Sequence, residues 1–363
     1  MQASQYLHRG LKMEYIKILD DFLSDFIDPK KRIFVGYLGL SLIIAYAWLI
    51  AVRNNTLKAA HAQIFNRKVF FSKSARIDYQ LFFINRIFSL LISPLLVTQI
   101  VIATFIFYEL HRQNIFHSGQ FSNSNKTFVV AFFSMSMFIV DDFTKYFLHR
   151  WMHHWPILWA FHKVHHSAET MTPITVYRVH PAEGILYGLR SAVAQGTVIS
   201  TFVFVFGNIV DLFTIVGVNI LVFFFHMAGS NLRHSHISIG YWKFLEHVFI
   251  SPAQHQLHHS VAEEHHDKNF GAALAIWDWL FGSLHLSVTE RNITYGLGEN
   301  DSGPKTIGHM YTKPFIDVIR ILVAFLKKTK KKLFSPSAEK PFEPRFRPLA
   351  SDGENAGSAP PES

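Results

Sequence analysis

The chain contains no cysteine among its 363 residues. This absence excludes disulfide bonds, thiolate metal sites and iron–sulfur clusters held by cysteine. Charged residues are also few, at 17% of the sequence, whereas hydrophobic residues make up 49% and phenylalanine occurs 36 times. The net charge is +9, but the lysines and arginines flank apolar blocks, which favours contact with lipid headgroups over binding of nucleic acid. The composition therefore predicts an integral membrane protein.

Apolar runs predict several membrane spans, while the first thirty residues are polar or amphipathic and show no cleavable signal peptide. Residues 33–52 are uncharged and have about the 20-residue length needed to cross a bilayer. Residues 87–108 are a second candidate span. Residues 127–140 continue into a polar, histidine-bearing segment, which predicts one helix that leaves the bilayer. Residues 191–210 and 212–225 predict a hairpin that returns to the same side.

Basic residues predict the orientation of these spans, because loops rich in Lys and Arg remain in the cytosol. Segment 53–86 carries seven basic residues against one acid, whereas segment 109–126 carries two basic residues. We therefore expect 53–86, 141–190 and 226–290 on the cytosolic face, together with the Lys-rich run 327–332. Basic residues before the first span leave the direction of that span open.

The chain is expected to be all-α, a multi-pass membrane helical bundle with a histidine-rich helical cap on its cytosolic side. Residues 335–363 hold six of the fourteen prolines and few large aliphatic residues, which predicts disorder. Residues 314–332 have an apolar face and a basic end, which is typical of a helix on a membrane surface or of one docked on the protein. The predicted parts are an N-terminal amphipathic segment (1–32), an N-terminal transmembrane region (33–126), a histidine-rich domain (127–290), a basic amphipathic segment (291–334) and a tail (335–363).

Histidine is concentrated in one region, with 17 of the 22 histidines between His149 and His285. Residues three or four apart share one face of a helix, so their imidazoles can reach a common metal ion. The histidines fall into three short clusters, called boxes here: one pair and two triplets. A proline suited to the first turn of a helix precedes each of the triplets, which are the second and third boxes. Two triplets and one pair with this spacing are typical of metal ligands. The boxes are His149 and His153; His162, His165 and His166; and His255, His258 and His259.

Other histidines receive separate interpretations. His226 ends an apolar run and His234 follows in the next loop, so both are candidate ligands, whereas His236 is less favoured. His154 should point about 100° away from His153 and lie outside the site. His180 precedes a proline, which disfavours a helical conformation and leaves it as a loop organiser or a ligand. We assign His247, His265, His266 and His285 to the surface or to outer positions.

Two polar residues precede the first box on the same helical face. Asp142 and Tyr146 lie seven and three residues before His149, where they are expected to hold the second ring nitrogen of a ligand. For Asp142, the alternative is that it only marks the end of the membrane span.

Eight to ten neutral imidazoles exceed the needs of one ion and predict two. Imidazole suits iron, copper, nickel and zinc, so ligand type alone does not select the metal. A catalytic zinc ion takes about three protein ligands, so a zinc pair would leave histidines over. An all-nitrogen pair with high coordination number fits iron that binds dioxygen.

The boxes resemble those of the fatty acid hydroxylase superfamily, also called the sterol desaturase family. The surrounding words match too: LWAFHKVHHS, YRVHPAE, SPAQHQLHHS, DKNFG at 267–271 and WDWLFGS at 277–283. The resemblance covers about residues 130–290 and implies a di-iron domain there. It implies an O2-dependent oxidoreductase in which two non-haem iron ions serve to hydroxylate or desaturate a lipid, such as a sterol or fatty acyl chain, or to cleave it oxidatively. Asn269 and Asp278, within these words, are expected as outer partners of the ligands.

Electrons are expected to come from NAD(P)H through a separate carrier, because no glycine-rich dinucleotide motif is present. A cytochrome b5-like protein, a ferredoxin or a reductase would dock on the basic cytosolic face, in the bacterial inner membrane or the endoplasmic reticulum. Two other function classes are open. A metal-dependent lipid hydrolase would work without oxygen, and a metal transporter or buffer would place its ligands inside the spans.

Overall fold

The computed structural model describes residues 23–92, 98–113, 117–211, 220–287, 293–298 and 303–334. Over these residues the chain is helical and has no strand, only the isolated bridges Phe249–Leu274 and Ser260–Tyr295. The expected all-α class is therefore confirmed. One compact unit runs to Ile321 and a second begins at Leu322. The expected segment 1–32 is described only from residue 23, and the tail 335–363 lies outside the described residues.

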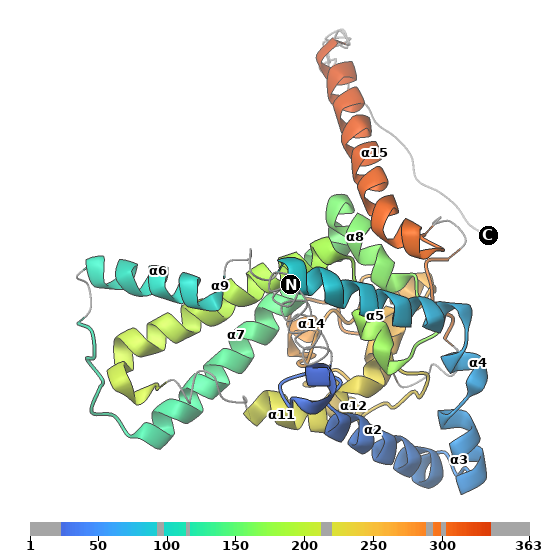
Figure 1. Cartoon of the computed structure of the whole chain (residues 1–363), viewed down its shortest axis with the longest axis horizontal. Coiled ribbons are helices and arrows are strands. Elements are labelled where there is room, and N and C mark those ends of the chain that lie inside the picture. Colours follow the sequence, from blue (N-terminus) through green and yellow to red (C-terminus); the bar gives the residue numbers. More distant parts are fainter. Residues whose placement is uncertain are drawn as a thin grey trace, which may run out of the picture. The chain divides into compact units, whose positions relative to one another are not determined.

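Figure 1 shows the helices of the described residues. In chain order they are α2 (Val35–Ala47), the π-helical turn η1 (Trp48–Val52), α3 (Leu57–Ile64), α4 (Arg67–Phe70), α5 (Lys73–Ile92), α6 (Gln99–Arg112), α7 (Lys126–His154), α8 (Pro156–His166), η3 (Pro173–Tyr177), α9 (Pro181–Phe206), η4 (Gly207–Ile209), α11 (Ile220–Met227), η5 (Ser230–His234), α12 (Lys243–Glu246), α13 (Pro252–His258), η6 (Glu263–His265), α14 (Ile276–Leu280) and α15 (Ile307–Phe334).

Among the described residues, three helical stretches are long and apolar enough to cross a membrane: Val35–Val52, Lys126–His154 and Pro181–Ile209. The first agrees with the span expected over 33–52. The second is α7, the single helix predicted to carry its polar end out of the bilayer. Along its apolar half, large side chains that recur at helical spacing are exposed, which suits contact with lipid. They are Phe128, Phe132, Met135 and Ile139.

The span expected over residues 87–108 is not one described helix. Residues 87–92 end α5, residues 93–97 lie outside the described residues, and α6 begins at Gln99. The second helix has its own start, because the side chain of Thr98 accepts a hydrogen bond from the backbone N–H of Val101. Continuous hydropathy therefore concealed a helix boundary.

Helix α9 is longer than the predicted first arm of the hairpin and begins at Pro181. The side chain of His180 caps it by accepting from the N–H of Ala182, which agrees with a non-helical His180. At the other end, Gly207 has φ +60°, a conformation that glycine adopts without a steric penalty. Of the second arm, α11 contains residues 220–225, and 212–219 lie outside the described residues.

Helices α6, α7 and α9 pack together on one side of the histidine region (Figure 1). Their shared core includes Val129, Phe133 and Phe202. Where α7 leaves its apolar half, the carboxylate of Asp141 accepts from Arg190 of α9 at 2.8 Å. This contact fixes the polar end of α7 against α9, and the histidines of the first box follow directly along α7.

The first part of α15 docks on the histidine-bearing helix α8. Lys163 of α8 forms a 2.6 Å ion pair with Asp317, and Met310 is buried with Leu81 and Val164. Of the two expected roles for this basic segment, the docked one applies to α15 up to Ile321. Farther along the same helix, Phe325 and Leu326 are exposed.

Candidate metal centre

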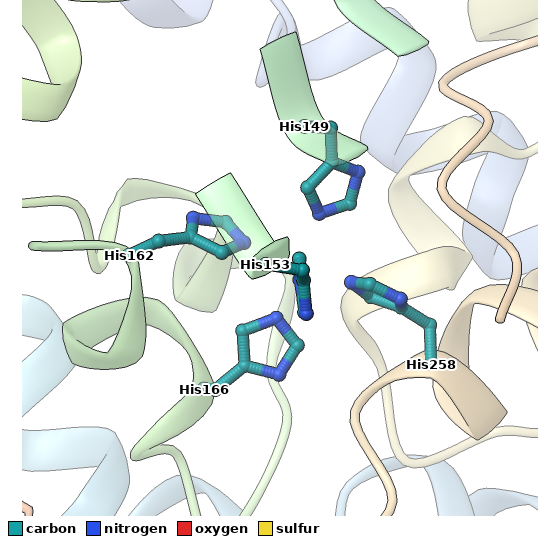
Figure 2. A group of neighbouring side chains, drawn as sticks. All are labelled: His149, His153, His162, His166 and His258. Atoms are coloured by element: carbon teal, nitrogen blue, oxygen red, sulfur yellow. The ribbon is translucent and has the colours of Figure 1, made fainter. Parts of the chain in front are cut away.

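Nine histidines gather into two groups, in each of which one ring nitrogen from every residue lies within 4.8 Å of the others. Figure 2 shows the rings of the first histidine group facing a shared space. Nearly all of these rings are buried. The first histidine group consists of His149, His153, His162, His166 and His258, and the second consists of His165, His234, His255 and His259.

Helical spacing explains how each of the two triplets contributes to both groups, whereas His149 and His153 both belong to the first group. Relative to a first residue, the fourth following residue is rotated by about 40° in one direction and the third by about 60° in the other. In α8, His162 and His166 therefore turn to the first group while His165 turns to the second. In α13, His255 enters the second group and His258 the first. Helices α8 and α13 thus bridge the groups, a division finer than the shared face expected from the sequence.

The second ring nitrogen of several histidines is held by a hydrogen-bond acceptor. Nδ1 of His149 lies 2.8 Å from the carbonyl oxygen of Phe270, and Nδ1 of His258 lies 2.7 Å from that of Lys268. Each Nδ1–H can donate to its carbonyl, which leaves the Nε2 lone pair directed into the group. Such partners fix the tautomer and the orientation of a metal-binding imidazole.

Glu183 holds the second ring nitrogen of His162 in the same way. Its Oε1 lies 2.8 Å from Nδ1 of His162, and both side chains are buried. Sequence reasoning did not assign Glu183 a role, although it lies in the word YRVHPAE that carried the resemblance. Its position in the first turn of α9 explains the contact, because α8 and α9 pack against each other.

His165 is positioned through a buried ion pair that was also not predicted. Its Nδ1 lies 3.2 Å from the carbonyl oxygen of Arg178. The guanidinium of Arg178 donates from Nε to Asp78 of α5 at 2.5 Å, and from Nη2 to the carbonyl oxygen of Ser74 at 2.8 Å. Helix α5 therefore anchors the backbone that orients His165.

The ring nitrogens of both groups fit bound cations. In the first group, the buried Nε2 atoms of His153, His162, His166 and His258 have no hydrogen-bond partner among the described residues. An unpartnered buried nitrogen is costly unless a ligand satisfies it. Lone pairs that converge without donors are the arrangement that a metal ion requires.

In the second group, Nε2 of His234 lies 3.1 Å from Nε2 of His165 and 3.0 Å from Nε2 of His255. One proton on His234 cannot serve both contacts, whereas a shared cation can. Burial, reinforced by neighbouring charges, lowers the pKa of all four rings in this group well below the usual 6.5. The rings are therefore neutral at pH 7, the form that binds metal.

The tenth expected ligand, His226, belongs to neither group. Its Nδ1 lies 2.7 Å from the hydroxyl of Ser230, and its ring packs on Tyr37 at 5.3 Å between centroids. His234, the last residue of η5, is the member of this region that the fold brings to the second group.

The two polar residues before the first box contact neither ring nitrogen of His149. Asp142 accepts hydrogen bonds from the N–H groups of Ala273 and Leu274 and from the indole of Trp277. The hydroxyl of Tyr146 contacts Ser283 at 3.0 Å and accepts from Arg150. Both residues therefore tie α7 to the segment 273–283, because their face of the helix meets that segment.

Asp278 and Asn269 shape the loop that supports the first group. The carboxylate of Asp278 accepts from the N–H groups of Phe270 and Gly271, so it fixes the carbonyl that His149 contacts. Asn269, with φ +57°, donates to the carbonyl of Gln254 in α13 and accepts from the N–H of His285. His180 caps α9 and lies 3.3 Å from the carbonyl oxygen of Tyr311 through Nε2.

The remaining histidines lie outside the two groups. Nδ1 of the exposed His154 lies 2.8 Å from the carbonyl oxygen of Arg150, and Nε2 of His236 lies 2.8 Å from that of Gln63. His247 contacts the carbonyl of Lys243, and the rings of His265 and His285 pack together at 5.1 Å. His266 lines a pocket beside the first group.

A cavity of about 410 Å³ reaches both groups; we call it the histidine cavity. Its lining includes His149 and His162 of the first group and His165, His234 and His255 of the second. A separate space of about 560 Å³, the apolar chamber, lies among side chains of α7, α11 and the segment after it. Phe138 and Phe225 line both spaces, so the two are neighbours. The arrangement can present an apolar molecule to buried metal-binding groups.

Comparison with known proteins identifies the region that contains this centre. Residues 134–283 match the model of the fatty acid hydroxylase family. Human alkylglycerol monooxygenase is 28% identical over 162 residues, which cover 45% of this chain and 32% of that protein. The zebrafish (Danio rerio) alkylglycerol monooxygenase is 28% identical over 163 residues, 44% of this chain and 32% of that protein. Ornithine lipid hydroxylase OlsE of Rhizobium tropici is 26% identical over 148 residues, 40% of each chain.

The similarity is confined to part of each protein: it spans a third to two fifths of the length of these relatives. No solved structure matches the chain.

Proposed function

Residues 134–283 belong to the fatty acid hydroxylase family, and we propose that the chain is an integral membrane, non-haem di-iron oxygenase that hydroxylates or desaturates a lipid. The observation that carries the proposal is the pair of buried histidine groups, with five and four converging ring nitrogens. Neutral nitrogen ligands in this number suit a pair of iron ions. The names of the relatives, alkylglycerol monooxygenase and ornithine lipid hydroxylase, support a lipid as substrate.

The proposed ligands are the nine members of the two groups, and His226 is a candidate that the geometry does not favour. Two ferrous ions held there would supply the activation of dioxygen and the oxidation of a C–H bond. The protein residues have other tasks. Glu183 and the carbonyls of Phe270, Lys268 and Arg178 hold the second nitrogens of ligating rings. These contacts keep the ligands oriented while a substrate enters and leaves.

The apolar lining supports a lipid substrate and a dry site. The apolar chamber is lined by side chains such as Met135, Ile139 and Phe224, next to the histidine cavity. Because Phe138 and Phe225 line both spaces, a hydrocarbon chain in the apolar chamber would lie next to the histidine cavity. Exclusion of water protects a reactive oxidant from side reactions.

We propose that electrons arrive from NAD(P)H through a separate carrier protein at the cytosolic side. The basic residues of segment 53–86 offer a complementary surface for an acidic carrier.

Isotope labelling tests the function directly. The purified chain is reconstituted with a reductase system and a mixed lipid extract under heavy-oxygen-labelled dioxygen, and products are analysed by mass spectrometry. An oxygenase incorporates the label from dioxygen or forms a desaturated product only when oxygen is present. Product formation without oxygen, with label taken up only from labelled water, would instead identify a metal-dependent lipid hydrolase.

A further inference from the structure

Two guanidinium groups lie side by side on the histidine cavity. Arg32 donates from Nη2 to the carbonyl oxygen of Ser230 at 3.4 Å, and Arg233 donates from Nε to the same oxygen at 3.2 Å. Both residues line the cavity, and Arg233 is only 6% exposed. Among the described residues neither arginine forms an ion pair, and Nε of Arg32 is buried without a hydrogen-bond partner.

The two positive charges disfavour each other. Bringing like charges together away from water costs free energy unless an opposite charge is near. An oxyanion is the partner that guanidinium groups bind best, because their planar N–H donors match phosphate and carboxylate oxygens.

The acidic residues of the cavity are already engaged elsewhere. Asp141 is paired with Lys145 at 2.6 Å and Arg190 at 2.8 Å. Asp142 accepts three N–H donors from segment 273–277, and Glu183 contacts His162. Neutral imidazoles contribute no negative charge. Arg233 also donates from Nη1 to the carbonyl oxygen of Ala272, but this acceptor is neutral. Among the described residues no negative charge therefore pairs with the two arginines, and an anionic ligand that enters the cavity can supply one.

The shape of the neighbouring space indicates what carries the anion. The guanidinium of Arg233 lies 5.0 Å from the ring centroid of Phe225. Phe225 lines the histidine cavity and also the apolar chamber. A ligand that uses both spaces has an anionic group at one end and a hydrocarbon chain at the other.

We propose that Arg32 and Arg233 bind the phosphate or carboxylate group of an anionic lipid whose hydrocarbon chain occupies the apolar chamber. The inference rests on the proposed function and adds the chemical class of the substrate headgroup. Arg32 also lies 3.4 Å from Nδ1 of His234 in the second histidine group. The carbon presented to the histidines is therefore one close to the anionic headgroup.

Binding of matched lipids tests the proposal without requiring catalysis. The full chain in neutral detergent is titrated anaerobically with oleyl phosphate, oleic acid at alkaline pH, oleyl alcohol and inorganic phosphate, and binding is followed by native mass spectrometry. The oleyl chain is common to the three lipids, so differences report the headgroup. We expect oleyl phosphate or oleate to bind about tenfold more tightly than oleyl alcohol, because hydrogen bonds to charged groups contribute about this much.

Variants assign that preference to the two arginines. Arg32→Gln is expected to remove most of the preference for the anionic lipids over oleyl alcohol, whereas Arg32→Lys should retain part of this preference. Arg233→Lys should weaken the preference, because the paired N–H donors are lost. Arg53 is an exposed arginine outside the cavity. Arg53→Gln makes the same change of charge and should leave the headgroup preference intact. Equal affinity for all three lipids, or a preference that survives Arg32→Gln, would overturn the proposal.

Tight binding of inorganic phosphate with no lipid preference would also overturn it, because the site would then hold a free anion. The experiment is separate from the proposed function. An active oxygenase without headgroup preference contradicts only the headgroup assignment, whereas anionic lipid binding without oxygen-dependent product contradicts only the reaction.

Discussion

The histidines of the centre differ in what holds their second ring nitrogen. His149, His165 and His258 contact backbone carbonyls, while His162 contacts the carboxylate of Glu183. Backbone acceptors cannot be removed by substitution, but Glu183 can. The individual contributions of ligand and positioning residue are therefore separable at this one ring.

Loss of a ligating ring should abolish the reaction. His165→Ala and His258→Ala each remove one nitrogen donor from a buried group, so we expect loss of lipid oxidation and lower metal content. His154→Ala is the matched control, since its exposed ring contacts the carbonyl of Arg150 outside both groups. Metal analysis and product assays, with detergent melting to confirm folding, check the prediction. Equal metal and activity in His165→Ala and His154→Ala would show that the groups are not ligand sets.

Glu183 should act as a positioning residue. Glu183→Ala removes the acceptor of Nδ1 of His162 and is expected to reduce metal affinity or activity by about 10–100-fold. Glu183→Gln should rescue part of this loss, because the amide oxygen can still accept the hydrogen bond. Glu169→Ala, at an exposed acid before η3, serves as control. A failure of Gln to rescue, with both variants fully folded, would argue against orientation of His162 by this contact.

At the level of elements, Asp142 and Tyr146 tie α7 to the segment 273–283. Asp142 accepts three hydrogen bonds from that segment, and Asp278 holds the Phe270 carbonyl in place for His149. The segment has little regular structure of its own apart from the short α14. Hydrogen bonds to carboxylates therefore hold this segment in place of regular backbone hydrogen bonding.

Asp142→Ala should affect stability more than metal binding. It leaves the buried N–H of Ala273, the partly buried N–H of Leu274 and the indole of Trp277 without their carboxylate acceptor, which we expect to cost about 3 kcal/mol or more of unfolding free energy. Trp277→Phe removes only one of these donors and should lower the melting temperature less. Detergent melting and iron content per folded chain are the measurements. Normal melting with strongly reduced iron would instead assign Asp142 to the metal site.

The sequence predicted the helices that carry the boxes, because their start signals are local. Pro156 opens α8 and Pro252 opens α13, as expected for the prolines that precede the second and third boxes. The division of each triplet between two groups depends on how α7, α8 and α13 pack, which spacing along one helix does not specify. Glu183 was missed for the same reason, since its contact with His162 joins different helices.

At the level of the whole molecule, orientation in the membrane is a prediction that rests on basic residues. Since the chain has no cysteine, single-cysteine variants report exposure without background. An impermeant maleimide should label Ser122→Cys in intact cells, whereas Lys58→Cys should react only after permeabilisation. Both native residues are exposed in the fold, so lack of labelling reflects the membrane. The opposite pattern would place the basic segment 53–86 outside the cytosol.

The proposed function requires that the two histidine groups of one chain bind two iron ions. The most direct measurement is metal stoichiometry of the full chain purified anaerobically from iron-supplied cells, determined by elemental analysis alongside the oxidation assay. Zinc can replace iron on overexpression because it exceeds Fe²⁺ in the usual affinity order, so both metals are counted and activity is assigned to the iron fraction. We expect close to two iron ions per active chain. Full activity with one metal ion per chain would contradict it.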